Sequence, residues 1–178
     1  MNIFTELINI LYPQTCIICG KININFLCEK CKKRIKKYEK YKLIQSKSFY
    51  IDKLFYCYEY RGIIRKILLD YKFYNKSYIC NCFAKMLLNC KKTYGFFSFY
   101  DIIIPVPIDK QKRINRGYNQ TELITNIIVQ KTNKSVILNK RIIVFDDIYT
   151  TGATADEISR ILKENGAKEI LFLVLAKD

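Results

Sequence analysis

From Asp101 onward the chain alternates short, almost wholly apolar segments with segments whose apolar residues recur at helical spacing. The apolar segments are Asp101–Pro105, Arg141–Asp146 and Ile170–Ala176. Between them, apolar side chains three and four residues apart predict helices around residues 123–128 and 158–162, and Gly166 suits the end of the second. A strand that is apolar on both faces must be covered on both faces. We therefore expect an α/β fold, a parallel sheet with helices on both sides.

The first third of the chain has a different character. Residues 1–40 hold four of the eight cysteines and are too few for a sizeable core. Residues 41–60 favour extended chain, because β-forming side chains dominate Leu54–Tyr60. Apolar spacing then predicts two helices, one from Ile63 and one from Ile79. With 178 residues available, we expect a small N-terminal part, residues 1–40, and one α/β domain, residues 41–178.

Four cysteines near the N-terminus form two Cys-x-x-Cys pairs separated by eight residues. They are Cys16, Cys19, Cys28 and Cys31. Two chelating thiolate pairs at this spacing are typical of a closed tetrahedral zinc site, and Gly20 suits the tight turn after the first pair. An iron–sulfur cluster uses the same ligands and stays open as an alternative. A site filled by four protein ligands has no position for substrate, so we expect the zinc to be structural.

One run, Val144–Thr154, joins an acidic pair to a turn rich in threonine and glycine. Its strand should deliver Asp146 and Asp147 to the carboxyl edge of the sheet, where such sheets bind ligands. The turn, with Gly152 free to adopt a positive φ, would present N–H groups to an anion at a helix N-terminus. The carboxylates suit vicinal hydroxyls, or waters on Mg²⁺. The run therefore predicts a site for ribose 5-phosphate. Its residues are Asp146, Asp147, Thr150, Thr151, Gly152, Ala153 and Thr154.

The run looks like the phosphoribosyl pyrophosphate motif of type I phosphoribosyltransferases, and further motifs narrow the resemblance to the ComF family of competence-associated proteins. Pro105–Pro107 follows a strand, where the family has its pyrophosphate loop. Arg113 and Arg116–Gln120 resemble the family's arginine-rich segment and its Arg-Gly-aromatic-Asn-Gln stretch. Tyr60–Gly62 and Lys72-Phe73 resemble its opening strand, helix and Lys-aromatic pair. Many family members also carry an N-terminal cysteine knuckle.

The resemblance implies that the protein binds phosphoribosyl pyrophosphate, or a 5-phosphorylated ribose, with Mg²⁺. It also implies a role in DNA uptake during natural transformation, through handling of single-stranded DNA beside partners of the competence machinery. Two alternatives stay open, an active phosphoribosyltransferase of nucleotide metabolism and a degenerate scaffold in a competence complex. If pyrophosphate is released, the candidate cations at it are Lys72, Arg113 and Arg116. Turnover is uncertain, because Lys131–Lys140 is shorter than the family segment that resembles the mobile active-site loop.

The net charge of +15 favours a polyanionic partner. Only seven of the 31 basic residues are arginines, and arginine is the side chain that reads base edges and clamps phosphates. Lysine suffices for nonspecific attraction to a nucleic-acid backbone, so charge alone leaves DNA binding open. If single-stranded DNA binds, Lys32–Lys37 and the tyrosine-rich Tyr56–Tyr60 are the segments suited to its phosphates and bases.

The N-terminal segment Met1–Pro13 has helical apolar spacing, an acidic Glu6 and no small-residue cleavage site. It predicts a short amphipathic helix docked on its own domain rather than a signal peptide or a membrane anchor. No apolar run reaches the length that crosses a bilayer. We therefore expect a cytoplasmic protein without a transmembrane segment.

Overall fold

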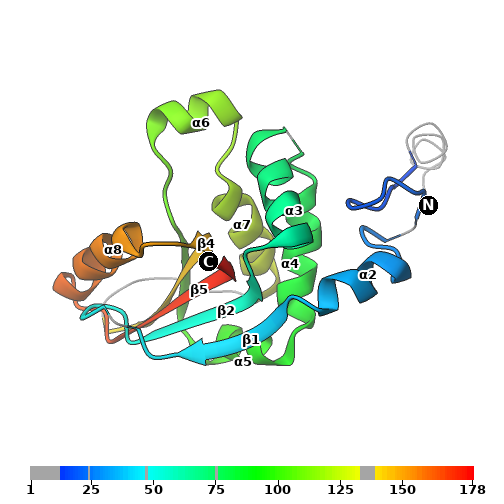
Figure 1. The fold of residues 1–178 in the computed structure, drawn as a ribbon. Helices are drawn as coiled ribbons and strands as arrows, with labels where there is room; N and C mark the ends of the chain where they lie inside the picture. The colour runs from blue at the N-terminus through cyan, green and yellow to red at the C-terminus, as the bar shows by residue number, and fades with distance from the viewer. Residues whose placement is uncertain (1–12, 24, 47, 75, 133–138) are drawn as a thin grey trace. The chain divides into compact units, whose positions relative to one another are not determined.

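The chain divides into two compact units, one that ends at Lys37 and one from Tyr38 to Asp178 (Figure 1). The helix expected for residues 3–11 lies outside the part of the chain that the structure describes. The computed structural model describes residues 13–23, 25–46, 48–74, 76–132 and 139–178.

The smaller unit contains the cysteine pairs and one helix, α2 (Glu29–Lys36). An antiparallel bridge joins Thr15 to Ile22 before the helix. One face of α2 buries Cys31 and Ile35, and its lysines lie toward solvent. So few buried side chains cannot stabilise a fold, and units of this size normally depend on a metal or a disulfide.

A five-stranded sheet organises the larger unit, in the order β1-β2-β5-β4-β3. The strands are β1 (Glu39–Ile44), β2 (Lys53–Glu59), β3 (Ile102–Pro105), β4 (Arg141–Tyr149) and β5 (Glu169–Lys177). The pairs β2–β5, β5–β4 and β4–β3 are parallel, as the apolar strands predicted. Strand β1 is antiparallel to β2 and forms one edge. The sheet is therefore mixed, with a parallel centre.

Helices connect the strands of this unit. They are α3 (Gly62–Phe73), α4 (Ile79–Asn89), α5 (Lys91–Phe99), α6 (Lys110–Arg116), α7 (Gln120–Thr132) and α8 (Ala153–Glu164). The apolar spacing predicted α3, α4, α7 and α8 but not the other two. In α5 a glycine separates Tyr94 from the later aromatic residues, and α6 is almost entirely polar. Helix α6 begins instead with a cap, because the Asp109 carboxylate accepts hydrogen bonds from the N–H groups of Gln111 and Lys112.

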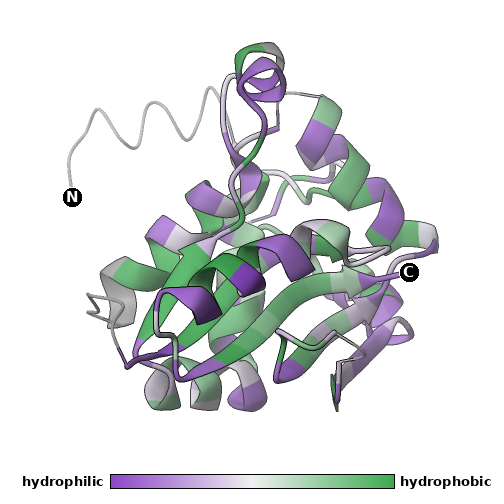
Figure 2. Cartoon of the chain, turned by 90° about the vertical axis from the view of Figure 1, so that its left-hand side faces the viewer, coloured by the Kyte–Doolittle hydropathy of each residue, from purple (hydrophilic) through white to green (hydrophobic). Residues whose placement is uncertain are grey.

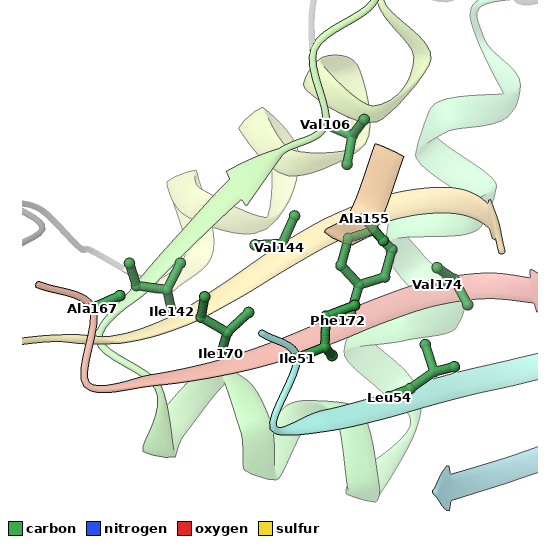
Figure 3. Close-up of a cluster of buried hydrophobic side chains, with 10 residues drawn as sticks. All are labelled: Ile51, Leu54, Val106, Ile142, Val144, Ala155, Ala167, Ile170, Phe172 and Val174. Carbon is green, nitrogen blue, oxygen red and sulfur yellow. The ribbon is translucent and has the colours of Figure 1, made fainter. Parts of the chain in front are cut away.

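The two faces of the sheet bury different side chains. One face carries Val144 and Phe172, which pack with Ala155 of α8 in the cluster of Figure 3. The other face carries Phe55 and Phe145, both fully buried. Helix α7 packs on that side against β3 and β4, and Phe96 of α5 meets Phe55 edge-to-face. Helices thus cover both faces, and the strands between them are hydrophobic over most of their length (Figure 2).

Strand β4 runs further than the apolar pattern predicted. It stays paired with β5 as far as Tyr149, so Asp147 is a strand residue like Asp146 rather than the start of a loop. Successive side chains of a strand point to opposite faces. The acidic pair is therefore divided between the two sides of the sheet.

Candidate functional site

A pocket opens where β4 ends and the chain turns into α8. The space within it, open solvent included, is about 270 Å³. Its walls come from β4, the turn and the first residues of α8, with Phe172 of β5 as the floor. The lining residues are Asp146, Ile148, Tyr149, Thr150, Thr151, Gly152, Ala153, Thr154, Ala155 and Phe172. The structure thus brings every predicted phosphoribosyl-binding residue to one pocket except Asp147.

The turn has the geometry of an anion cradle. Gly152 has a φ of +86°, and a Cβ there would collide with the ring of Tyr149, so only glycine fits without strain. Gly152 is also the N-cap of α8, whose first N–H groups have no acceptor within the helix. Thr150, Thr151 and Thr154 are exposed and add hydroxyl groups. The Ala153 N–H donates to the Thr151 hydroxyl at 3.5 Å. The other N–H groups at the helix N-terminus and the positive end of the helix dipole favour a phosphate.

The acidic pair has two distinct environments. Asp146 lines the pocket, and its Oδ1 accepts a hydrogen bond of 2.7 Å from the Asp147 N–H. The Asp147 carboxylate forms an ion pair of 2.9 Å with the ammonium of Lys72, at the end of α3. The Asp147 side chain is 6% exposed, and the Lys72 side chain is 21% exposed. Asp146 is therefore the carboxylate available to a ligand, while Asp147 already has a cationic partner.

Burial raises the pKa of Asp146 to about 7, and the neighbouring Asp147 charge acts in the same direction. The hydrogen bond from the Asp147 N–H and the Lys72 ammonium both lower this pKa, but by less. A carboxyl group that ionises near neutral pH can donate or accept a proton at a ligand hydroxyl. A carboxyl group in this state therefore suits a neutral sugar hydroxyl better than a second anionic group.

The other two predicted cations lie on the segment after β3. The Arg116 guanidinium lies 5.0 Å from the centre of the Phe73 ring and donates a 3.0 Å hydrogen bond to Gln120. Phe73 follows Lys72 in α3, so the structure brings Lys72 and Arg116 to the same region. Arg113 is 62% exposed and only 3.6 Å from Glu122. An ion pair this long and this exposed fixes the Arg113 side chain only weakly.

The Arg-Gly-Tyr-Asn-Gln stretch supports the loop after β3. The Asn119 amide and the Thr121 hydroxyl both donate to the carbonyl of Val106. Tyr118 donates to the carbonyl of Tyr71, and Tyr71 donates to the carbonyl of Gln120. These bonds tie α3 to the start of α7. Sequence reasoning missed Tyr71, because its spacing fits an ordinary core position.

The cysteine cluster lies in the smaller unit. The sulfur atoms of Cys16, Cys19, Cys28 and Cys31 all lie within 4.8 Å of one another. In the described part of the chain, no other group of three or more cysteine, histidine or acidic side chains comes together in this way. Four sulfurs at these separations can surround one Zn²⁺.

Backbone hydrogen bonds shape the knuckle. The N–H of Gly20 donates to the carbonyl of Cys16, and the N–H of Cys31 donates to that of Cys28. Burial opposes ionisation of Cys16, but N–H groups of Cys28, Cys19 and Ile18 outweigh it and lower its pKa to about 6. Burial and the neighbouring sulfurs raise the pKa of Cys31. Four thiolates this close repel one another, and a dication removes that repulsion.

We expect one zinc ion per chain, released by Cys28→Ser. Metal binding of about 10–16 kcal/mol supplies the folding free energy of such a unit, so the variant should lose the structure of residues 13–37 and keep the sheet. Elemental analysis and far-ultraviolet circular dichroism check this. Cys90→Ser, outside the cluster, is the control and should keep its zinc. Iron in the purified protein, or zinc retained by Cys28→Ser, would contradict the assignment.

We also expect Asp146→Asn to stabilise the protein at pH 8. The folded state keeps a proton on Asp146 up to about pH 7, whereas the unfolded chain releases it near the ordinary value of 3.8. The folded state therefore loses stability as the pH rises between these values, and asparagine avoids a penalty on the order of 4 kcal/mol. Thermal unfolding should show that Asp146→Asn is more stable than the wild-type protein at pH 8, and that this difference shrinks toward pH 4. An equal gain at both values would refute the shift.

Comparison with known proteins gives two kinds of match. A family model described as a double zinc ribbon domain matches residues 7–41. Together with the four-cysteine cluster, this match supports structural zinc. Among the described residues, none of the helices has the length and apolar character needed to cross a bilayer.

Competence proteins match most of the chain. Competence protein ComFC of Streptococcus pneumoniae is 26% identical over 140 residues, 62% of this chain and 62% of that protein. The chain thus spans less than two thirds of that relative's length. Competence protein F of Haemophilus influenzae is 25% identical over 221 residues, 91% of this chain and 96% of that protein. The second match exceeds the 178 residues of this chain, so that relative has residues that this chain lacks.

A further match is partial. Orotate phosphoribosyltransferase of Helicobacter pylori is 39% identical over 56 residues, 32% of this chain and 28% of that protein. It agrees with the phosphoribosyltransferase-like architecture of the mostly parallel sheet and its helices. The resemblance drawn from the motifs is confirmed: the chain is similar to ComF competence proteins, and it has an N-terminal zinc ribbon and a phosphoribosyltransferase-like α/β fold.

Proposed function

We propose that this protein binds a 5-phosphorylated ribose, as phosphoribosyl pyrophosphate or a related phosphoribosyl group, and acts in DNA uptake during natural transformation. The main support for this ligand is the pocket, which is lined both by the anion cradle at the start of α8 and by the Asp146 carboxylate. The names of the related competence proteins support the DNA-uptake role.

The two halves of the ligand suit different parts of the pocket. The 5-phosphate fits the N–H groups and hydroxyls of Thr150–Thr154, where a helix N-terminus contributes about 1–2 kcal/mol and charge-assisted hydrogen bonds add to it. The ribose hydroxyls fit Asp146, whose Oδ2 is not used by the Asp147 N–H. Gly152 lets the backbone approach the phosphate closely. Inorganic phosphate would contact the cradle alone. Ribose 5-phosphate would also contact Asp146, so the pocket should bind the sugar phosphate more tightly.

The acidic pair does not form a resident Mg²⁺ site. Oδ1 of Asp146 accepts a backbone hydrogen bond, and Lys72 pairs with Asp147. Mg²⁺ needs several oxygen ligands in octahedral geometry and often takes them from ligand phosphates and water. If Mg²⁺ takes part, we propose that it arrives with the diphosphate of phosphoribosyl pyrophosphate.

We propose that turnover is slow or absent. The segment Lys131–Lys140 is the place where the family has a longer, loop-bearing stretch, and the Haemophilus relative does contain residues that this chain lacks. Residues 133–138 of this segment lie outside the described residues. A stretch too short to cover a bound ligand would admit water and lose contacts to the departing pyrophosphate. An active phosphoribosyltransferase remains the second candidate, because Lys72 and Arg116 still offer cationic groups near the site. Pyrophosphate release with a panel of bases separates the two.

Ribose 5-phosphate should bind the wild-type protein, and Gly152→Ala should abolish binding. The added Cβ meets the Tyr149 ring, and alanine is strained at a φ of +86°. Isothermal titration calorimetry measures both affinities. Gly95→Ala is the matched control, because a Cβ there meets nothing within 4 Å and the residue lies within α5. If ribose 5-phosphate and inorganic phosphate bind wild-type protein equally weakly, or Gly152→Ala binds normally, the proposed site is wrong.

Single-stranded DNA should bind weakly, through charge more than through base identity. The +15 net charge and the exposed lysines of α2 favour contact with the phosphate backbone of the DNA. Fluorescence anisotropy with a labelled oligonucleotide should show affinity falling at least about tenfold between roughly 50 and 200 mM salt. The double variant Lys33→Gln/Lys36→Gln should weaken binding more than Lys110→Gln/Lys112→Gln in α6, which removes the same charge elsewhere. Salt-independent or undetectable binding would count against this role.

A further inference from the structure

The four sulfur atoms of the zinc ribbon lie close together, but they differ in their access to solvent. Cys16 and Cys31 are each 1% exposed, whereas Cys19 is exposed and Cys28 is half-buried. Oxidation of a cysteine depends on its thiolate character and its exposure. Metal binding keeps all four sulfurs in the thiolate form. Exposure therefore decides which sulfur an oxidant reaches first, and that sulfur belongs to Cys19.

The two buried sulfurs are poor targets for an oxidant. The N–H groups of Ile18, Cys19 and Cys28 donate hydrogen bonds to the Cys16 sulfur. These bonds reduce the electron density with which that sulfur could attack an oxidant. Cys31 lies on the buried face of α2. One pair of cysteines thus anchors the ribbon inside the unit, and the other pair is accessible from solvent.

The exposed sulfur has a second thiolate within reach. The Sγ atoms of Cys19 and Cys28 are 3.8 Å apart. A disulfide places its sulfur atoms about 2.05 Å apart, so the two atoms must approach by about 1.8 Å. Cys28 is the N-cap residue of α2, but its side chain makes no capping hydrogen bond that would hold the sulfur in place. Cys28 is therefore suited to react with an oxidised Cys19.

We propose that Cys19 and Cys28 form a redox-sensitive pair, which hydrogen peroxide converts to a disulfide and which thereby controls whether the ribbon keeps its metal. The Cys19 thiolate attacks one oxygen of the peroxide, the O–O bond breaks and releases hydroxide, and the sulfur becomes a sulfenic acid. The Cys28 thiolate then attacks that sulfur and displaces a second hydroxide. The two thiolates lose two electrons, and the two peroxide oxygens gain them.

The disulfide removes two of the four ligands of the site. Cys16 and Cys31 alone cannot complete the tetrahedral set that a structural zinc ion requires. Because a unit this small takes its folding free energy from the metal, the oxidised chain should lose the structure of α2. Helix α2 carries the lysines proposed to contact DNA, so oxidation would disperse that surface and leave the sheet intact. The chemistry of the cysteine pair does not depend on the DNA contact.

The test follows the metal and the cysteines in the whole zinc-loaded chain. Hydrogen peroxide should release the zinc to a chromogenic chelator, and peptide mass spectrometry should find a disulfide between Cys19 and Cys28. Far-ultraviolet circular dichroism should show a loss of helix. A thiol reductant with added Zn²⁺ should reverse both changes, because a disulfide is reducible and a sulfinic acid is not.

Cys19→His separates metal binding from oxidation. Three cysteines and one histidine are a common structural zinc set, and an imidazole forms no disulfide. The variant should keep its zinc and release it at least about tenfold more slowly in peroxide. Cys90→Ser, which removes a half-buried cysteine outside the cluster, should release zinc at the wild-type rate. If Cys19→His does not retain zinc, the disulfide found in the oxidised wild-type protein decides.

Three results overturn the inference. The first is zinc retained by the wild-type protein under peroxide that does oxidise Cys90. The second is a disulfide within one Cys-x-x-Cys pair in place of the bond between Cys19 and Cys28. The third is release from zinc-loaded Cys19→His as fast as from the wild type. Absence of zinc from untreated protein would contradict the zinc assignment and this inference together.

Discussion

The pairing of β4 with β5 is the constraint on which the rest of the larger unit depends. The two strands are hydrogen-bonded along their whole length, from Arg141 opposite Glu169 to Tyr149 opposite Lys177. Residues 170–176 are buried on both faces. A strand of this kind cannot remain at a surface, so helices must pack on each side. Its two neighbours, β2 and β4, run parallel to it. The carboxyl ends of β3, β4 and β5 consequently meet at one edge of the sheet.

Strand β4 imposes a second requirement where its sequence changes from apolar to acidic. Its apolar residues belong to the core, but the ladder to β5 continues past them through Asp146 and Asp147. Two adjacent carboxylates are thereby held partly inside a hydrophobic layer, which costs free energy unless each finds a partner. Asp147 forms an ion pair with the ammonium of Lys72, and the pKa of Asp146 is higher than that of a free aspartate. The chemical asymmetry of the pair follows from strand alternation alone.

The sequence allowed the central strands, four of the six helices in the larger unit, the cysteine cluster and the phosphate turn to be predicted, because each depends on spacing along the chain. Helices α5 and α6 were missed because capping and tertiary contacts determine them rather than apolar periodicity. The division of the acidic pair was missed for another reason. The end of β4 was placed at Asp146, and a strand only a few residues longer decides which face each carboxylate occupies. The partnership of Lys72 with Asp147 joins residues 75 positions apart, beyond the reach of any local pattern.

The hydrogen bonds of Tyr71 have a consequence for how this sequence can change over generations. Its hydroxyl donates to Gln120, and its own carbonyl accepts from the hydroxyl of Tyr118. Both rings also contact one another, with their centres 5.8 Å apart. Losing either hydroxyl strands a carbonyl that has little access to water. Substitutions that remove either hydroxyl should therefore be selected against, so that a helix and a loop far apart in the chain keep their two tyrosines together.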